Sequence, residues 1–162
     1  MKPFIVILED DHLQEDLLRD RLHRAFPAAR IDTLVTEQEF RQRLVDFRAH
    51  RPDVIIMDVM LRWAFPSPAA TAPPAEVASG GYQRAGFRCA ELLFQDAALR
   101  DIPVIYYTIL EGGDLEPDTR RLSGSTTYVR KSKDHEYLAR KVRDLVRPAD
   151  AHNGAPRRSI VT

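Results

Sequence analysis

Residues 52–61 read PDVIIMDVML, an apolar run that one carboxylate, Asp58, interrupts. Four consecutive apolar residues rich in β-branching are typical of a strand buried on both faces of a parallel sheet. Aspartate is uncommon in strands and is rarely buried without a partner. We therefore expect Asp58 at the carboxyl end of the strand, where open α/β sheets bind their ligands. On these residues alone, a helix-capping role explains Asp58 equally well.

The composition narrows the class of protein. The chain has 162 residues, of which 44% are hydrophobic and 30% charged, as expected for one globular domain. Its formal net charge is zero, which disfavours direct binding to nucleic acid. The one cysteine, Cys89, excludes an internal disulfide and a cysteine-based zinc site. No apolar run is long enough for membrane insertion and no signal-peptide pattern is present, so we expect a cytoplasmic protein.

Strand and helix patterns alternate along the chain. Apolar runs predict five strands, at residues 4–8, 30–35, 54–57, 102–107 and 126–129. Helical spacing predicts a helix after each of the first, second, third and fifth strands. In the first helix we expect an inward stripe of Leu13, Leu17, Leu18, Leu22 and Phe26, and in the third helix one of Ala90, Leu93 and Ala97. This alternation predicts an α/β doubly wound, five-stranded parallel sheet with helices on both faces.

Two stretches break the alternation, and a tail follows it. Residues 62–85 contain four of the eleven prolines and a Gly-Gly pair, so we expect a long loop without a regular helix. Residues 112–124 contain Gly and Pro that restrict any helix to about residues 117–122. We expect residues 1–148 to form the domain and residues 149–162 to form a flexible C-terminal tail.

Polar side chains follow four of the predicted strands: Glu9 and Asp10, Asp58, Thr108, and Lys131. Because the carboxyl ends of parallel strands meet at one edge, we expect these side chains to converge. Three carboxylates close together repel one another, and Mg²⁺, which prefers oxygen ligands, relieves that repulsion. A carboxylate can attack phosphorus to form an aspartyl-phosphate, with Lys131 neutralising phosphoryl charge and Thr108 donating a hydrogen bond. Each residue alone has an ordinary structural explanation, and their joint order and spacing favour the functional one.

The segments FIVILEDD, DVIIMDVM, IPVIYYT and YVRK resemble the receiver domain of two-component response regulators. The similarity covers about residues 3–146 with residues 62–85 set aside. It implies a flavodoxin-like fold with strand order 2-1-3-4-5 and Mg²⁺ as the cofactor. It also implies that Asp58 is the phosphoacceptor, supplied by a sensor histidine kinase or a histidine phosphotransfer protein.

The resemblance assigns a role to each matching position. It implies direct Mg²⁺ ligands at Asp10, Asp58 and the Met60 backbone carbonyl, a water-mediated one at Glu9, a switch hydroxyl at Thr108, a state-dependent aromatic at Tyr128 and a phosphoryl-binding lysine at Lys131.

The chain departs from the family pattern after the phosphoacceptor. The glycine that opens the next helix matches Gly86, which is 28 positions after Asp58 (86 − 58) instead of about eight, so roughly twenty residues are inserted. This insertion is either a lid or a partner-docking loop anchored by Trp63, Phe65 and Tyr82, or a tolerated floppy segment.

Further departures lie at single positions. Arg62 stands where the family usually has proline, and Ser132 where it usually has a cis proline. Ile109, Leu110 and Met60 are apolar, so none of these side chains can orient an attacking water. We therefore expect slow self-dephosphorylation and restricted access for small phosphodonors.

The leading hypothesis is a stand-alone response regulator receiver that signals to an unknown downstream protein through phosphorylation-shifted contacts. It would be no enzyme beyond self-catalysed phosphoryl transfer and hydrolysis, and homodimerisation stays open. The alternative is a degenerate receiver that acts as a phosphorylation-independent interaction module. A small aspartate-nucleophile phosphatase is disfavoured, because such enzymes need a second acid where this chain has Met60.

Overall fold

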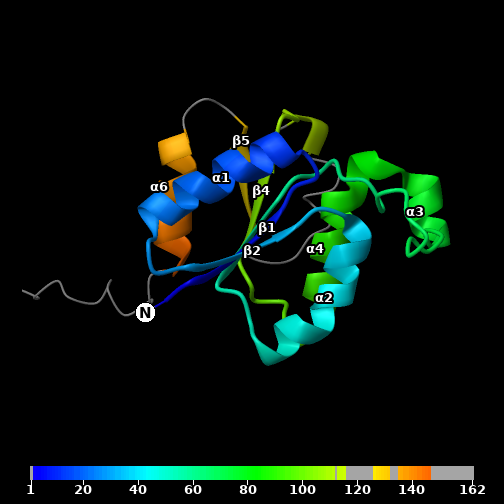
Figure 1. Cartoon of the computed structure of the whole chain (residues 1–162), viewed down its shortest axis with the longest axis horizontal. Coiled ribbons are helices and arrows are strands. Elements are labelled where there is room, and N and C mark those ends of the chain that lie inside the picture. The colour runs from blue at the N-terminus through cyan, green and yellow to red at the C-terminus, as the bar shows by residue number, and fades with distance from the viewer. Residues whose placement is uncertain (1, 112, 116–125, 132–134, 147–162) are drawn as a thin grey trace, which may run out of the picture.

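The predicted apolar runs form one parallel sheet of five strands, in the order β2-β1-β3-β4-β5 (Figure 1). The computed structural model describes residues 2–111, 113–115, 126–131 and 135–146. The strands are β1 (Phe4–Leu8), β2 (Arg30–Leu34), β3 (Val54–Met57), β4 (Val104–Thr108) and β5 (Thr126–Arg130). The predicted fold class and strand order are confirmed.

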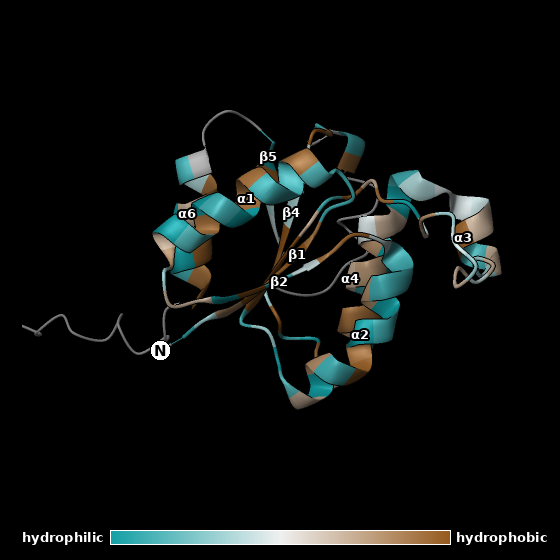
Figure 2. Cartoon of the chain, in the orientation of Figure 1, coloured by the Kyte–Doolittle hydropathy of each residue, from teal (hydrophilic) through white to brown (hydrophobic). Residues whose placement is uncertain are grey.

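Helices cover both faces of the sheet. They are α1 (His12–Ala25), α2 (Glu37–Ala49), α3 (Ala75–Gly80), the 3₁₀ turn η1 (Tyr82–Arg84), α4 (Ala85–Gln95) and α6 (His135–Val146). Helices α1 and α6 pack together on one face, and α2 and α4 on the other (Figure 1). Each pair encloses its own apolar cluster against the sheet, and the central strands β1, β3 and β4 are fully buried and strongly hydrophobic (Figure 2). None of the described helices is long and apolar enough to cross a membrane.

Two predicted apolar stripes are partly wrong. In α1, Leu18 and Leu22 are buried, whereas Leu13 is 68% and Leu17 42% exposed. At about 100° per residue, the first pair points well over 90° away from the second, and the sheet can bury only one side of the helix. Ala97 is exposed because α4 ends at Gln95.

The segment 62–84 carries regular structure, contrary to the prediction that no helix forms there. Helix α3 forms because Pro74 lies just before its first residue, where proline removes no helical hydrogen bond, and Val77 is buried. The ends of the segment meet where the Leu61 N–H donates to the Tyr82 carbonyl at 3.0 Å. The predicted helix near residues 117–122, Ser132 and the predicted C-terminal tail lie outside the described residues.

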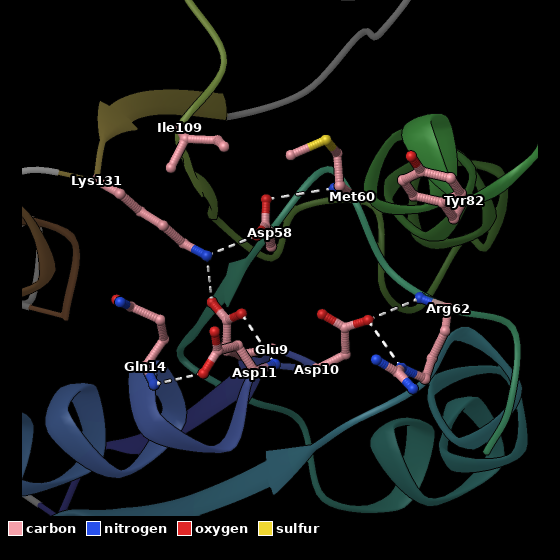
Figure 3. A pocket seen from close by; sticks show the side chains of 10 residues that line it. All are labelled: Glu9, Asp10, Asp11, Gln14, Asp58, Met60, Arg62, Tyr82, Ile109 and Lys131. Atoms are coloured by element: carbon pink, nitrogen blue, oxygen red, sulfur yellow. Dashed lines mark hydrogen bonds and ion pairs between the residues drawn. The ribbon is translucent and has the colours of Figure 1, made fainter.

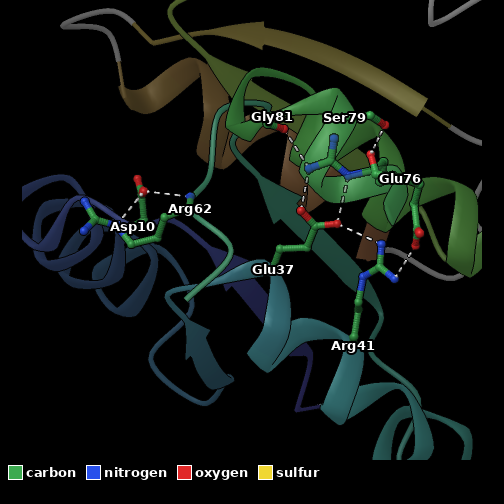
Figure 4. Close-up of polar contacts among 8 residues, drawn as sticks. Asp10, Glu37, Arg41, Arg62, Glu76, Ser79 and Gly81 are labelled. Carbon is green, nitrogen blue, oxygen red and sulfur yellow. Dashed lines mark hydrogen bonds and ion pairs between the residues drawn. The ribbon is translucent and has the colours of Figure 1, made fainter. Parts of the chain in front are cut away.

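A network of ion pairs fixes this segment to the α2/α4 face (Figure 4). Glu37, fully buried at the start of α2, accepts hydrogen bonds from Arg88 of α4 at 2.6 and 3.0 Å and from Arg41 at 3.0 Å. Arg41 also pairs with Glu76 of α3 at 3.0 Å, and Arg88 donates to the Gly81 carbonyl at 2.8 Å. A buried carboxylate is tolerated only when its charge is compensated, so this network ties the position of α3 to the core.

Gly86 lies against the backbone of Asp58. A Cβ atom at position 86 would come within 2.2 Å of the Asp58 carbonyl oxygen and 2.8 Å of Val59 Cα. The Gly86 N–H donates to the Val59 carbonyl at 2.9 Å. Only glycine therefore allows the first turn of α4 to approach the end of β3 so closely.

We expect Gly86→Ala to lower the free energy of unfolding by about 1–3 kcal/mol, because backbone atoms must move to admit the methyl group. Gly113→Ala is the matched control, since a Cβ there meets no atom within 4 Å. Urea denaturation should place this control within about 0.5 kcal/mol of the wild type. Equal stability of Gly86→Ala and the wild type would contradict the close approach.

Candidate functional site

A pocket of about 610 Å³ opens at the carboxyl edge of the sheet (Figure 3). It is lined by Glu9, Asp10, Asp11, Gln14, Asp58, Met60, Arg62, Tyr82, Ile109 and Lys131. Five of the seven predicted site residues are among them, and Thr108 and Tyr128 are not. The carboxyl ends of the parallel strands β1, β3 and β5 thus deliver their polar residues to one cavity.

Lys131 joins two of the predicted acids. Its Nζ lies 2.6 Å from Asp58 Oδ2 and 2.6 Å from Glu9 Oε2 (Figure 3). Asp58 and Glu9 are buried, with only 6% and 2% of their surfaces exposed. One ammonium therefore compensates two buried carboxylates from neighbouring strands.

The backbone orients the Asp58 carboxylate. The Asp58 N–H donates to the Leu8 carbonyl of β1 at 2.9 Å, which extends the ladder of β3 by one residue. Oδ1 accepts hydrogen bonds from the N–H groups of Val59 at 2.6 Å and Met60 at 3.3 Å. Both Asp58 carboxylate oxygens are thus held just past the end of β3, Oδ1 by backbone amides and Oδ2 by Lys131.

Burial and the contact with each other shift the pKa values of Glu9 and Lys131. Burial raises the pKa of Glu9 from 4.5 to about 7, because the attraction of Lys131 offsets only part of the desolvation. Burial alone would lower the pKa of Lys131, but the charges of Asp58 and Glu9 outweigh it and raise that pKa above its usual value. Lys131 therefore stays charged, and Glu9 is the group that titrates near neutral pH.

Asp10 has a different partner. Its Oδ2 accepts hydrogen bonds from both the backbone N–H and the Nε of Arg62, each at 3.1 Å. Asp11, which lines the same pocket, caps α1 by accepting from the N–H groups of Leu13 and Gln14. Arg62 was identified in the sequence only as a departure from proline, and its pairing with Asp10 was not predicted.

The three predicted acids, Glu9, Asp10 and Asp58, line one pocket but do not form a single close cluster. Within the described part of the chain, no three His, Cys, Asp or Glu side chains gather closely enough to hold a metal ion. Two cationic side chains pair with these three acids. Lys131 compensates Glu9 and Asp58, and Arg62 compensates Asp10.

The donors in the pocket still fit Mg²⁺ by their chemistry. Asp10 and Asp58 offer carboxylate oxygens, and Met60, whose backbone carbonyl is the third predicted ligand, is among the residues that line the same pocket. Mg²⁺ is usually held by one or two carboxylates and completes its shell with water. The two cations already paired there show that these carboxylates attract positive charge.

Thr108 and Tyr128 meet at the loop that follows β4. Thr108 is fully buried, and its Oγ1 accepts a long hydrogen bond of 3.5 Å from the Leu110 N–H. The Tyr128 hydroxyl donates to the Leu110 carbonyl. The Thr108 carbonyl accepts from the Lys131 N–H at 2.8 Å, so the backbone beside the pocket lysine is tied to this loop.

Trp63, Phe65 and Tyr82, the predicted anchors of a lid or docking loop at residues 62–85, differ in their contacts. The Trp63 indole N–H donates to the Thr71 carbonyl at 2.8 Å, and Phe65 stacks on His12 at the start of α1. Tyr82 is instead 60% exposed at the rim of the pocket.

Comparison with solved structures identifies the fold. The phosphorylated cyanobacterial phytochrome response regulator RcpA is 19% identical, over 90% of this chain and 91% of that one, with a TM-score of 0.64. A receiver domain of a DNA-binding response regulator from Colwellia psychrerythraea is 22% identical, over 90% and 98%, with a TM-score of 0.65. The chain has the receiver-domain fold.

A third receiver structure contains a metal. The receiver domain of a sensor histidine kinase from Pseudomonas aeruginosa, with magnesium coordinated in its active-site cleft, is 15% identical, over 90% of this chain and 98% of that one, with a TM-score of 0.63. No family model matches the sequence, and no curated protein matches it. At these identities the likeness to other receivers is one of fold, so residue roles rest on the pocket itself.

We expect Glu9→Gln to change how stability depends on pH in metal-free protein. Because the pKa of Glu9 is about 7 when folded and near 4.5 when unfolded, the folded state binds more protons between these values. Its contribution to stability is therefore present below the lower value and is lost as the pH rises through 7. Urea denaturation from pH 5 to 8 should show a smaller decline for Glu9→Gln than for the wild type. The exposed Glu91→Gln is the control and should follow the wild type; an identical profile for Glu9→Gln would contradict the assignment.

Proposed function

We propose that this protein is a phosphoacceptor of two-component signalling, in which Asp58 takes a phosphoryl group from a phosphohistidine of a sensor kinase or a histidine phosphotransfer protein. The observation that carries the proposal is the contact of 2.6 Å between Lys131 Nζ and Asp58 Oδ2 inside an open pocket. Phosphoryl transfer to an aspartate requires a nucleophilic carboxylate next to a positive charge, which Lys131 supplies here.

In this reaction an Asp58 oxygen attacks phosphorus while the P–N bond to the donor imidazole breaks, and the electron pair of that bond leaves with the imidazole. Lys131 pairs with a phosphoryl oxygen and so reduces the repulsion between the incoming group and the pocket acids. Mg²⁺, held by Asp10, Asp58 and the Met60 carbonyl with Glu9 acting through water, would supply further positive charge to the phosphoryl oxygens. Apolar Met60 and Ile109 at the pocket wall offer no group that orients water, which favours a long-lived aspartyl-phosphate.

The loop after β4 provides a switch. Thr108 and Tyr128 both hold Leu110 in the present structure, through its N–H and its carbonyl. If the Thr108 hydroxyl turns to a phosphoryl oxygen, the Leu110 N–H loses its acceptor and the loop gains a second arrangement. Phosphorylation then shifts the population between two loop states, and a downstream protein reads the difference.

The second candidate is a receiver that works as an interaction module without phosphorylation. It is favoured by the observation that each predicted metal-binding carboxylate already has a protein cation as partner. Beryllofluoride, which mimics a phosphoryl group on aspartate, separates the two. Bound fluoride in ¹⁹F NMR in the presence of Mg²⁺ supports phosphoacceptance, and its absence supports the module.

We expect Asp58→Asn to abolish labelling by phosphorylated histidine kinases, because an amide cannot form the acyl phosphate. The control is Asp16→Asn, which removes a carboxylate from an exposed ion pair on α1. A panel of kinases labelled on histidine should transfer phosphoryl to the wild type and the control within the same time. Labelling that survives in Asp58→Asn would move the acceptor to another residue.

A further inference from the structure

Arg62 binds the Asp10 carboxylate, the predicted metal ligand that follows β1, through two hydrogen-bond donors. Its backbone N–H and its side-chain Nε both donate to Asp10 Oδ2 at 3.1 Å (Figures 3 and 4). The Arg62 side chain is 48% exposed and the Asp10 side chain 21%. The guanidinium is therefore at the rim of the pocket, next to an oxygen that faces it.

The position of Arg62 is fixed by its surroundings. The Arg62 carbonyl accepts from the Glu37 N–H at 3.0 Å, which binds the backbone to the first turn of α2. Its guanidinium carbon lies 4.4 Å from the centre of the Phe65 ring, which stacks in turn on His12 of α1. Because the side chain is already ordered by these contacts, pairing with Asp10 costs little additional entropy.

A guanidinium in this place opposes a divalent cation. Two cations that use the same carboxylate repel each other, and an Asp10 oxygen that accepts two hydrogen bonds has less capacity for a metal. We propose that Arg62 is a built-in competitor of Mg²⁺ at Asp10, which lowers the affinity of the pocket for the metal and gives way when the metal binds. This inference rests on the proposed function, since it assumes that Asp10 is a metal ligand.

The competition couples the metal to the segment 62–84. Trp63, the next residue, is bound through its carbonyl to the Gln38 N–H at 2.9 Å, and its ring lies 5.5 Å below the Arg41 guanidinium. Arg41 also holds α3 through Glu76. By reciprocity, a contact that favours the Arg62–Asp10 pair weakens metal binding, and metal binding weakens that contact by the same free energy.

Calorimetric titration with MgCl₂ at low ionic strength tests the inference. Arg62→Gln removes the competing charge and keeps the backbone donor, so we expect roughly three- to tenfold tighter binding than in the wild type. Arg62→Lys keeps a cation but not the planar fork, and should lie between the two. Arg48→Gln is the matched control. Arg48 lies at the far end of α2 and forms a 2.7 Å ion pair with Asp96; the Arg48 side chain is 56% exposed and the Asp96 side chain 15%. This variant should bind Mg²⁺ as the wild type does.

The outcomes separate the inference from the function on which it rests. Tighter binding in Arg62→Gln alone supports the competition. Equal affinities in the wild type and Arg62→Gln overturn it and leave the Mg²⁺ site intact. Absence of binding in every variant overturns both the metal site and the competitor.

Discussion

The contact of Lys131 with two buried carboxylates is the interaction on which the pocket depends. Glu9 directly follows β1, Asp58 directly follows β3 and Lys131 directly follows β5, so one ammonium joins the ends of three strands. Without it, two buried carboxylates would lie close together with no cation to compensate them, which is strongly unfavourable. Burial raises the pKa of Glu9 to about 7, because the attraction of Lys131 offsets only part of the desolvation.

Charge compensation also fixes the segment 62–84, which lies beside the pocket. Glu37 is fully buried between two arginines, and this group fixes the segment 62–84 to the α2/α4 face. Arg62, at the start of that segment, compensates Asp10. The segment is therefore an electrostatic part of the pocket wall, and we propose that it is an insertion in the receiver fold. On the proposal that Arg62 competes with Mg²⁺, uptake of the metal at Asp10 would exchange one cation for another.

Much of this arrangement could be predicted from the sequence. Buried parallel strands must be continuous apolar runs, and the polar residues that end them must share an edge, so the sheet and the meeting of Glu9, Asp58 and Lys131 followed from local patterns. Which side of α1 is buried did not follow, because Leu13 belongs to an equally regular stripe and only packing chooses between them. The pairing of Arg62 with Asp10 joins positions 52 residues apart and depends on the three-dimensional course of the chain, which spacing does not encode.

Chemical mapping of the phosphorylated residue tests whether Asp58 is the phosphoacceptor. Borohydride reduces an aspartyl-phosphate to homoserine, which marks the acceptor within the intact wild-type chain. The protein is phosphorylated by a histidine kinase, reduced and digested for peptide mass spectrometry. If Asp58 is the phosphoacceptor, we expect homoserine at position 58 and at no other acidic residue. Conversion of Glu9, Asp10 or Asp11 instead of Asp58, or a stable phosphoramidate on histidine, would contradict it.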